Sequence, residues 1–108
     1  MREAMEITTF RLSNGWTIDD FIAANADVDA WLRKQPGFML RRICERADGS
    51  VIDMLLWRSA KDGRRAAGAI VTELANSPVH AAIDQSTVDW SVQPCAHRLD
   101  RDRVHRIR

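Results

Sequence analysis

The chain has 108 residues, of which 45% are hydrophobic and 29% charged; this is the composition of one globular domain and excludes a disordered or fibrous chain. Its 16 Lys and Arg residues nearly balance its 15 Asp and Glu residues, so the net charge of +1 gives no overall field that would attract nucleic acid or an acidic membrane. The sequence shows neither the apolar run of a signal peptide nor the roughly 18 apolar residues of a membrane span, so we expect a cytoplasmic protein without membrane partners.

The first elements in chain order are a strand and a helix. Residues 5–12 are rich in β-branched and aromatic side chains and stop at the turn Ser13-Asn14-Gly15, which predicts a strand. Thr17 with Asp20 three residues later is typical of a helix start, and Pro36-Gly37 is a stop signal. Apolar residues at helical spacing in between predict one helix over residues 17–34.

A hairpin and a second helical region follow. Residues 38–46 and 50–57 flank Ala47-Asp48-Gly49, and Asp-Gly is typical of a tight hairpin turn. Ser59 predicts the cap of a helix that ends near Asn76, and its inner face is formed by Ala67, Ile70, Val71 and Leu74. Ser77-Pro78 predicts a short helix to about Asp84, and residues 87–92 predict the last strand.

The element order is therefore β-α-β-β-α-β, which predicts an α+β, ferredoxin-like fold: a four-stranded antiparallel sheet with helices on one face. We assign residues 1–92 to this domain and residues 93–108 to an Arg-rich C-terminal tail. The tail has five arginines but interleaved aspartates and no aromatic residue for base stacking, so nucleic-acid binding is not expected. A solvated tail and a tail lying against a second subunit both remain open.

Both faces of the predicted sheet are apolar. In the third strand Val51, Leu55 and Trp57 alternate with Ile52, Met54 and Leu56, and in the second strand strict alternation sets Phe38, Leu40 and Cys44 against Met39 and Ile43. Helices on one face leave the other exposed, and a second copy of the chain covers such a face most simply. The pattern therefore predicts a homodimer.

Four segments carry a family resemblance: the strand EITTFRL, the run WLRKQPGFMLRR, the hairpin ADGSVIDMLLWRS and the turn SPVHAAID. Over about residues 5–92 the chain resembles the antibiotic biosynthesis monooxygenase-like (ABM) domain family, whose members pair into dimeric α+β barrels. The resemblance implies a small-molecule site, because the family includes cofactor-free oxygenases of polyphenols or quinols, haem-degrading enzymes and members without assigned chemistry.

The resemblance also narrows the chemistry. Haem-degrading members have Asn, Trp and His where this chain aligns Thr8, Glu73 and Ile83, so haem cleavage is not expected. The chain has no tyrosine, which excludes a tyrosine-dependent mechanism. Cys44 and Cys95 lack metal-ligand spacing, and we expect free thiols, no metal site and no cofactor.

Six residues are candidates for the site. Asn25 lies within an apolar helical stripe, and His80 is the candidate base; we expect these two to be catalytic. The candidates for substrate binding are Arg41, Trp57, Asp29 and Thr8. Five of them have a structural alternative: a satisfied core amide for Asn25, a surface or cap residue for His80, core packing for Trp57, a surface pair with Arg33 for Asp29, and for Arg41 an ion pair with Asp53 or Glu45 across the dimer.

The sequence thus predicts a cofactor-independent monooxygenase for a small planar phenolic or quinol-type substrate. In that scheme Asn25 and Arg41 donate hydrogen bonds to the substrate anion, His80 takes the proton and Trp57 forms a wall. The alternative is a non-catalytic dimeric α+β barrel that binds a small molecule or has a structural role.

Overall fold

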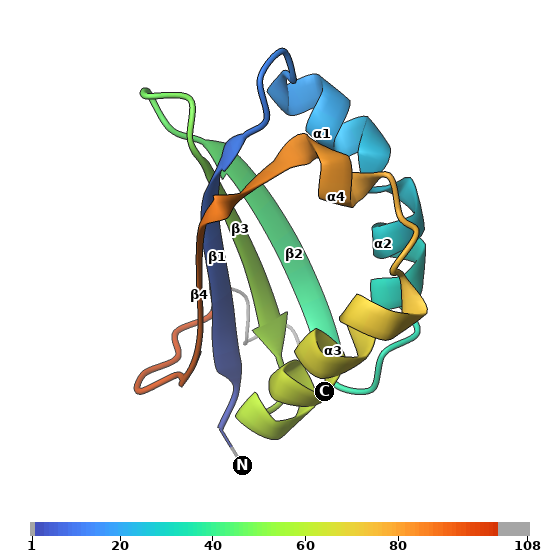
Figure 1. The fold of residues 1–108 in the computed structure, drawn as a ribbon. Coiled ribbons are helices and arrows are strands. Elements are labelled where there is room, and N and C mark those ends of the chain that lie inside the picture. Colours follow the sequence, from blue (N-terminus) through green and yellow to red (C-terminus); the bar gives the residue numbers. More distant parts are fainter. Residues whose placement is uncertain (1, 102–108) are drawn as a thin grey trace.

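The structure, a computed structural model, describes residues 2–101. Within them, four strands form one antiparallel sheet in the order β2-β3-β1-β4, and four helices cover one of its faces (Figure 1). The strands are β1 (Ala4–Leu12), β2 (Phe38–Glu45), β3 (Val51–Trp57) and β4 (Ile83–Pro94). The helices are α1 (Ile18–Ala24), α2 (Ala26–Leu32), α3 (Ala60–Glu73) and α4 (Val79–Ala82). The predicted ferredoxin-like fold is confirmed.

The helix predicted over residues 17–34 is two helices. The break lies at Asn25, where the backbone takes φ −94° and ψ 5°. The side-chain Nδ2 of Asn25 donates to the Phe21 carbonyl at 2.7 Å, and its backbone N–H turns to the Ile22 carbonyl instead. A short polar side chain thus replaces the backbone donor that would have continued the helix, which is how asparagine interrupts helices. The predicted start is confirmed, because Thr17 and Asp20 form a reciprocal capping box.

The hairpin and the Ser59 cap form as predicted, but strict alternation in β2 was wrong. The register with β3 shifts between Phe38 and Leu40, so Phe38 pairs with Trp57 while Arg41 pairs with Leu55. One extra residue in a strand reverses the facing of everything after it. Phe38 and Ile43, predicted on opposite faces, therefore both pack against the core on the helix side.

The core lies between the sheet and the helices. On β1 the residues in alternation with Phe10 face the helices, and in α3 the buried positions are Gly63 and Ala66. Ile70 and Leu74 pack against the core as predicted, but Val71 is 66% exposed, so its place on the inner face was wrong. Helix α3 is rotated toward its small residues, which lets it approach the Trp57 ring.

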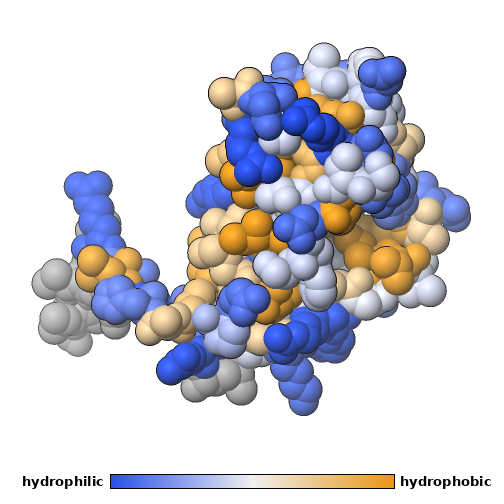
Figure 2. Space-filling view, turned by 60° about the vertical axis from the view of Figure 1, so that its left-hand side comes forward, coloured by the Kyte–Doolittle hydropathy of each residue, from blue (hydrophilic) through white to orange (hydrophobic). Residues whose placement is uncertain are grey.

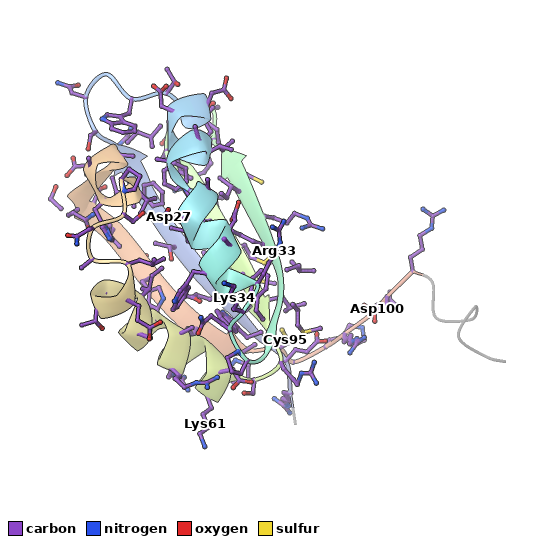
Figure 3. All side chains as sticks on the ribbon, turned by 90° about the vertical axis from the view of Figure 1, so that its right-hand side faces the viewer. Asp27, Arg33, Lys34, Lys61, Cys95 and Asp100 are labelled. Carbon is purple, nitrogen blue, oxygen red and sulfur yellow. The ribbon has the colours of Figure 1, made fainter. Side chains whose placement is uncertain are left out.

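The last helix and strand differ from their predicted bounds. Helix α4 ends at Ala82, and β4 begins at Ile83 instead of Thr87, because Ile83 and Asp84 pair with the end of β1. The strand also continues past Val92 to Pro94, inside the predicted tail. Residues 95–100 then extend away from the body (Figure 3), where Arg98 pairs with Glu3 and Asp100. Residues 102–108 of the predicted tail lie outside the described residues.

The face of the sheet opposite the helices carries an apolar patch, which we call the outer-face patch (Figure 2). Its side chains alternate with the buried ones along β1 and β3 and are half-buried. The patch consists of Met5, Ile7, Leu40, Ile52, Met54 and Leu56. None of the described helices is long and apolar enough to cross a membrane.

Candidate functional site

A cavity of about 550 Å³ lies between the inner face of the sheet and the helices. Its lining is mostly apolar and includes the aromatic side chains of Phe10, Trp31, Trp57 and Trp90. Few polar groups interrupt this surface. A concave, aromatic-lined space with a small number of placed polar groups is the usual form of a small-molecule site.

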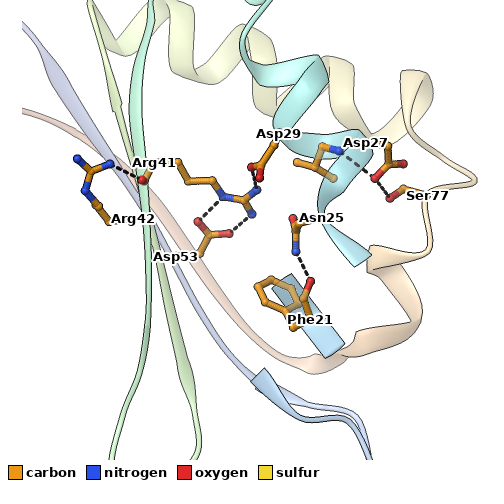
Figure 4. A network of polar contacts seen from close by, with 9 residues as sticks. Phe21, Asn25, Asp27, Asp29, Arg41, Arg42, Asp53 and Ser77 are labelled. Atoms are coloured by element: carbon orange, nitrogen blue, oxygen red, sulfur yellow. Dashed lines mark hydrogen bonds and ion pairs between the residues drawn. The ribbon is translucent and has the colours of Figure 1, made fainter. Parts of the chain in front are cut away.

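Asn25 lines this cavity and holds a buried acceptor that lacks a partner. The residue is only 1% exposed and lines the cavity. Its Nδ2 must face the Phe21 carbonyl, because a carbonyl can only accept, so Oδ1 is the free atom (Figure 4). This oxygen is buried without a hydrogen-bond partner, a state that costs about 1–3 kcal/mol. Asn25 was predicted to donate to the substrate, but the atom that it leaves free is an acceptor.

Arg41 lies at the centre of a buried ion network. The bulge in β2 turns it toward the helices, where Nε and Nη2 donate to the two oxygens of Asp53 at 3.0 and 2.6 Å. Its Nη1 donates to Asp29 at 2.8 Å (Figure 4). The side chains of Arg41 and Asp53 are 11% and 10% exposed, whereas that of Asp29 is 49% exposed. The predicted pairing of Arg41 with Asp53 thus forms, but within one chain.

The network stabilises the charged form of Arg41 and occupies two groups that were predicted to bind substrate, Arg41 and Asp29. Burial alone would lower the pKa of the Arg41 guanidinium, but the hydrogen bonds and charge of Asp53, and then of Asp29, raise its pKa above the usual value. Three of its nitrogens are already bonded to acids, so it is not a free cation for a substrate anion. Asp29 does not line the cavity, and its predicted pair with Arg33 was wrong, because it bonds Arg41 instead.

Glu6 is a functional candidate that the sequence prediction missed. Its carboxylate accepts the indole N–H of Trp57 at 2.8 Å with Oε1 and that of Trp90 at 2.6 Å with Oε2. The residue is 8% exposed and lines the cavity. Burial raises the pKa of Glu6, the two indole hydrogen bonds oppose this, and Asp53 adds to the rise. Alternation along β1 could have found it, because Glu6 shares the parity of the buried Phe10.

His80 and Thr8 complete the polar lining. The Nε2 atom of His80 lies 2.8 Å from the Leu74 carbonyl, so Nε2 carries a proton and Nδ1 keeps a lone pair in the neutral ring. Thr8 follows Glu6 by two residues on the same face of β1 and pairs with Asp53. Of the six predicted residues, the structure brings Asn25, His80, Arg41, Trp57 and Thr8 together around the cavity and leaves Asp29 behind Arg41.

No protein-family model matches the sequence, and no curated protein matches it significantly. Solved structures do match the fold. A variant of SnoaB, a cofactor-independent oxygenase from Streptomyces nogalater, superposes with a TM-score of 0.71 at 17% identity, over 94% of this chain and 100% of that one. The chain has the fold of the antibiotic biosynthesis monooxygenases.

Two further structures share this monooxygenase fold. A candidate antibiotic biosynthesis monooxygenase from Nitrosomonas europaea has a TM-score of 0.68 at 12% identity, over 89% of this chain and 92% of that one. The ActVA-Orf6 monooxygenase of Streptomyces coelicolor, in complex with nanaomycin D, has a TM-score of 0.64 at 16% identity, over 94% of each chain. The same fold also occurs in proteins of unknown function. At these identities the likeness establishes the fold and no specific activity.

Proposed function

We propose that the protein is a cofactor-independent oxygenase of a small planar phenolic or quinol-type substrate. The observation that carries the proposal is the aromatic-lined cavity whose wall contains a buried, unpaired acceptor, Asn25 Oδ1. A ligand hydroxyl is the kind of group that would satisfy this oxygen. The fold shared with SnoaB, a cofactor-independent oxygenase, and with ActVA-Orf6, which binds nanaomycin D, supports the same function.

In the proposed reaction the substrate supplies the electrons. Its hydroxyl donates to Asn25 Oδ1 on binding and then turns to Nδ1 of His80, which takes the proton. The Leu74 carbonyl holds the other ring nitrogen in the protonated form, so Nδ1 is the nitrogen that can accept. The deprotonated ring then reduces O₂. One oxygen atom enters the ring carbon, the other leaves as water, and a phenol becomes a quinone. Trp57 forms a wall that keeps bulk water from the intermediate.

Oxygen uptake tests this proposal. We expect purified protein with a chelator and no added flavin to consume O₂ with anthrone or a naphthalenediol, and to form the quinone in equal amount. His80→Gln should lower the rate by about 100-fold or more, the usual size of a general acid–base contribution. Asn25→Ala should lower it at least about fivefold through the lost hydrogen bond. Asn76→Ala and His97→Gln change exposed residues outside the cavity and serve as matched controls. Unchanged turnover in both cavity variants would refute these roles.

A non-catalytic binding protein is the second candidate. It is favoured by the engagement of Arg41 with two acids and of His80 with Leu74, and by the absence of tyrosine from the chain. In such a protein, binding of the same phenols would quench the fluorescence of the cavity tryptophans, and no oxygen would be consumed. Saturable quenching without O₂ uptake would therefore favour this second function.

We also propose that two copies pair through the outer-face patch. The patch spans β1, β2 and β3, and a symmetric pair would bury the same residues of both copies. Light scattering at micromolar concentration should give twice the mass of one chain. Met54→Glu, at the centre of the patch, should give the single mass, whereas Val71→Glu, at an exposed position of α3 on the helix side, should not. A single mass for the native protein would contradict the proposal.

A further inference from the structure

We infer that the cavity binds its ligand in the neutral, hydrogen-bond-donating form and rejects anions, and that Glu6 and Asn25 set this selectivity. The inference rests on the proposed function, because it concerns the phenolic ligand of the same cavity. It reverses the predicted electrostatics, in which arginine and amide donors would hold a substrate anion. Binding selects the neutral phenol, and the anion of the proposed reaction forms only afterwards, when His80 takes the proton and its imidazolium balances the new charge.

The first argument is the kind of polar atom that the lining residues leave with unused hydrogen-bonding capacity. Asn25 offers a buried Oδ1 with no partner. Glu6 offers carboxylate oxygens that each accept one indole N–H and have further lone pairs. His80 offers Nδ1, because Nε2 donates to Leu74. Each of these three side chains can accept a hydrogen bond from a donor on the ligand. The hydroxyl of Thr8 can donate or accept.

The second argument is the charge around the cavity, taken from every element that lines it. β1 contributes the acid Glu6 and β3 the acid Asp53, and α2 sets Asp29 behind them. β2 contributes Arg41, whose positive charge is paired with Asp53 and Asp29. α4 contributes His80. The remaining cation of the lining is Arg64 on α3, which is exposed to solvent.

With Glu6 ionised, the buried groups of the lining therefore carry a net negative charge. A phenolate or carboxylate in the cavity would meet a like charge and would leave Asn25 Oδ1 unpaired. A neutral hydroxyl would instead satisfy an acceptor that is otherwise buried without a partner. Selection between the two forms follows from the geometry of Glu6 and Asn25 alone and needs no turnover.

para-Nitrophenol tests the inference, because its phenol and phenolate forms absorb at different wavelengths. We expect the native protein to bind the phenol, to raise the pKa of the bound phenol above that of free nitrophenol, and to bind para-nitroanisole and para-nitrobenzoate at least roughly tenfold more weakly. Both analogues keep the ring and nitro group, but the first has no donor and the second is an anion.

The variants separate the residues involved. Glu6→Gln should lower the pKa of bound nitrophenol toward that of the free phenol, and Asn25→Ala should bring nitrophenol and nitroanisole to similar affinities. Glu73→Gln is the matched control, because Glu73 accepts the indole N–H of Trp31 at 2.8 Å in an exposed pair. It should change neither quantity.

Tighter binding of the phenolate or of nitrobenzoate would overturn the inference, as would equal binding of phenol and anisole by the native protein. The measurement on native protein stands even if a variant does not fold. Oxygen uptake with inverted selectivity would refute this inference alone, and the expected selectivity without oxygen uptake would refute the oxygenase alone.

Discussion

Replacing Gly63 by alanine tests how closely α3 approaches Trp57. A Cβ at this position would lie 2.9 Å from Trp57 Cδ1 and 3.2 Å from Cγ, closer than side chains tolerate. The ring is held in place by two contacts. Its Nε1 bonds Glu6 at 2.8 Å, and Phe38 packs on it edge-on with ring centroids 5.7 Å apart. The helix, the ring or both must therefore move.

The size of the effect follows from two opposing contributions. Overpacking of a core costs about 1–3 kcal/mol. Alanine in place of glycine in a helix gains up to about 1 kcal/mol. Gly63→Ala should therefore lower the free energy of unfolding by roughly 0–3 kcal/mol. Gly68→Ala is the matched control, because it lies in the same helix and its Cβ would meet nothing within 4 Å.

Urea denaturation of both variants, at one fixed protein concentration so that assembly does not differ, gives the comparison. The control should be more stable than the native protein by up to about 1 kcal/mol, and Gly63→Ala should lie about 1–3 kcal/mol below the control. The fluorescence of Trp57 should change only in Gly63→Ala. Equal stability of the two variants would show that the approach of α3 to Trp57 is not tight, and would refute the reasoning.

Three further predictions concern polar groups. Asp53→Asn should lower the free energy of unfolding by about 3–5 kcal/mol, because it breaks a buried ion pair. Asp29→Asn should lower it by at most about 1 kcal/mol, because Asp29 is half exposed. Urea denaturation compares the two variants, and equal losses would contradict the network. The pKa of Glu6 is raised by burial, so its ionisation in the folded state is unfavourable: the native protein should be most stable relative to Glu6→Gln at acidic pH and lose that advantage as pH rises through the folded pKa. Denaturation across pH shows this, and a gain with rising pH would contradict it. Thr17→Ala should cost about 1 kcal/mol in the same assay by removing the cap of α1, and no loss would contradict the cap.

The sequence predicts the order of strands and helices well, because each is bounded by a local signal. Asp48-Gly49 forms the hairpin turn, Thr17 and Ser59 cap helices, and the apolar periods separate strands from helices. These signals act over a few residues and depend little on the rest of the fold, so the elements that they predict are found in the structure.

The cavity is predicted less well, because its polar groups depend on two irregularities. The bulge near Met39 reverses the facing of Arg41 relative to Phe38, and the break at Asn25 turns an amide from helix interior to helix end. Neither the bulge nor the break lies at a glycine or proline, the residues that would have predicted an irregularity there. Glu6 was missed for another reason: its partners Trp57 and Trp90 come from distant strands, and one carboxylate in a strand gives no local sign of being buried.

The break at Asn25 has a consequence for how this chain can change. The amide interrupts a helix and buries an oxygen that nothing in the described chain satisfies, so it costs stability twice. Alanine at this position would allow the helix to continue and would remove the unpaired oxygen. Selection for stability alone would favour that replacement. Under the proposed function, a ligand hydroxyl bound to Oδ1 would offset the cost and favour asparagine at this position.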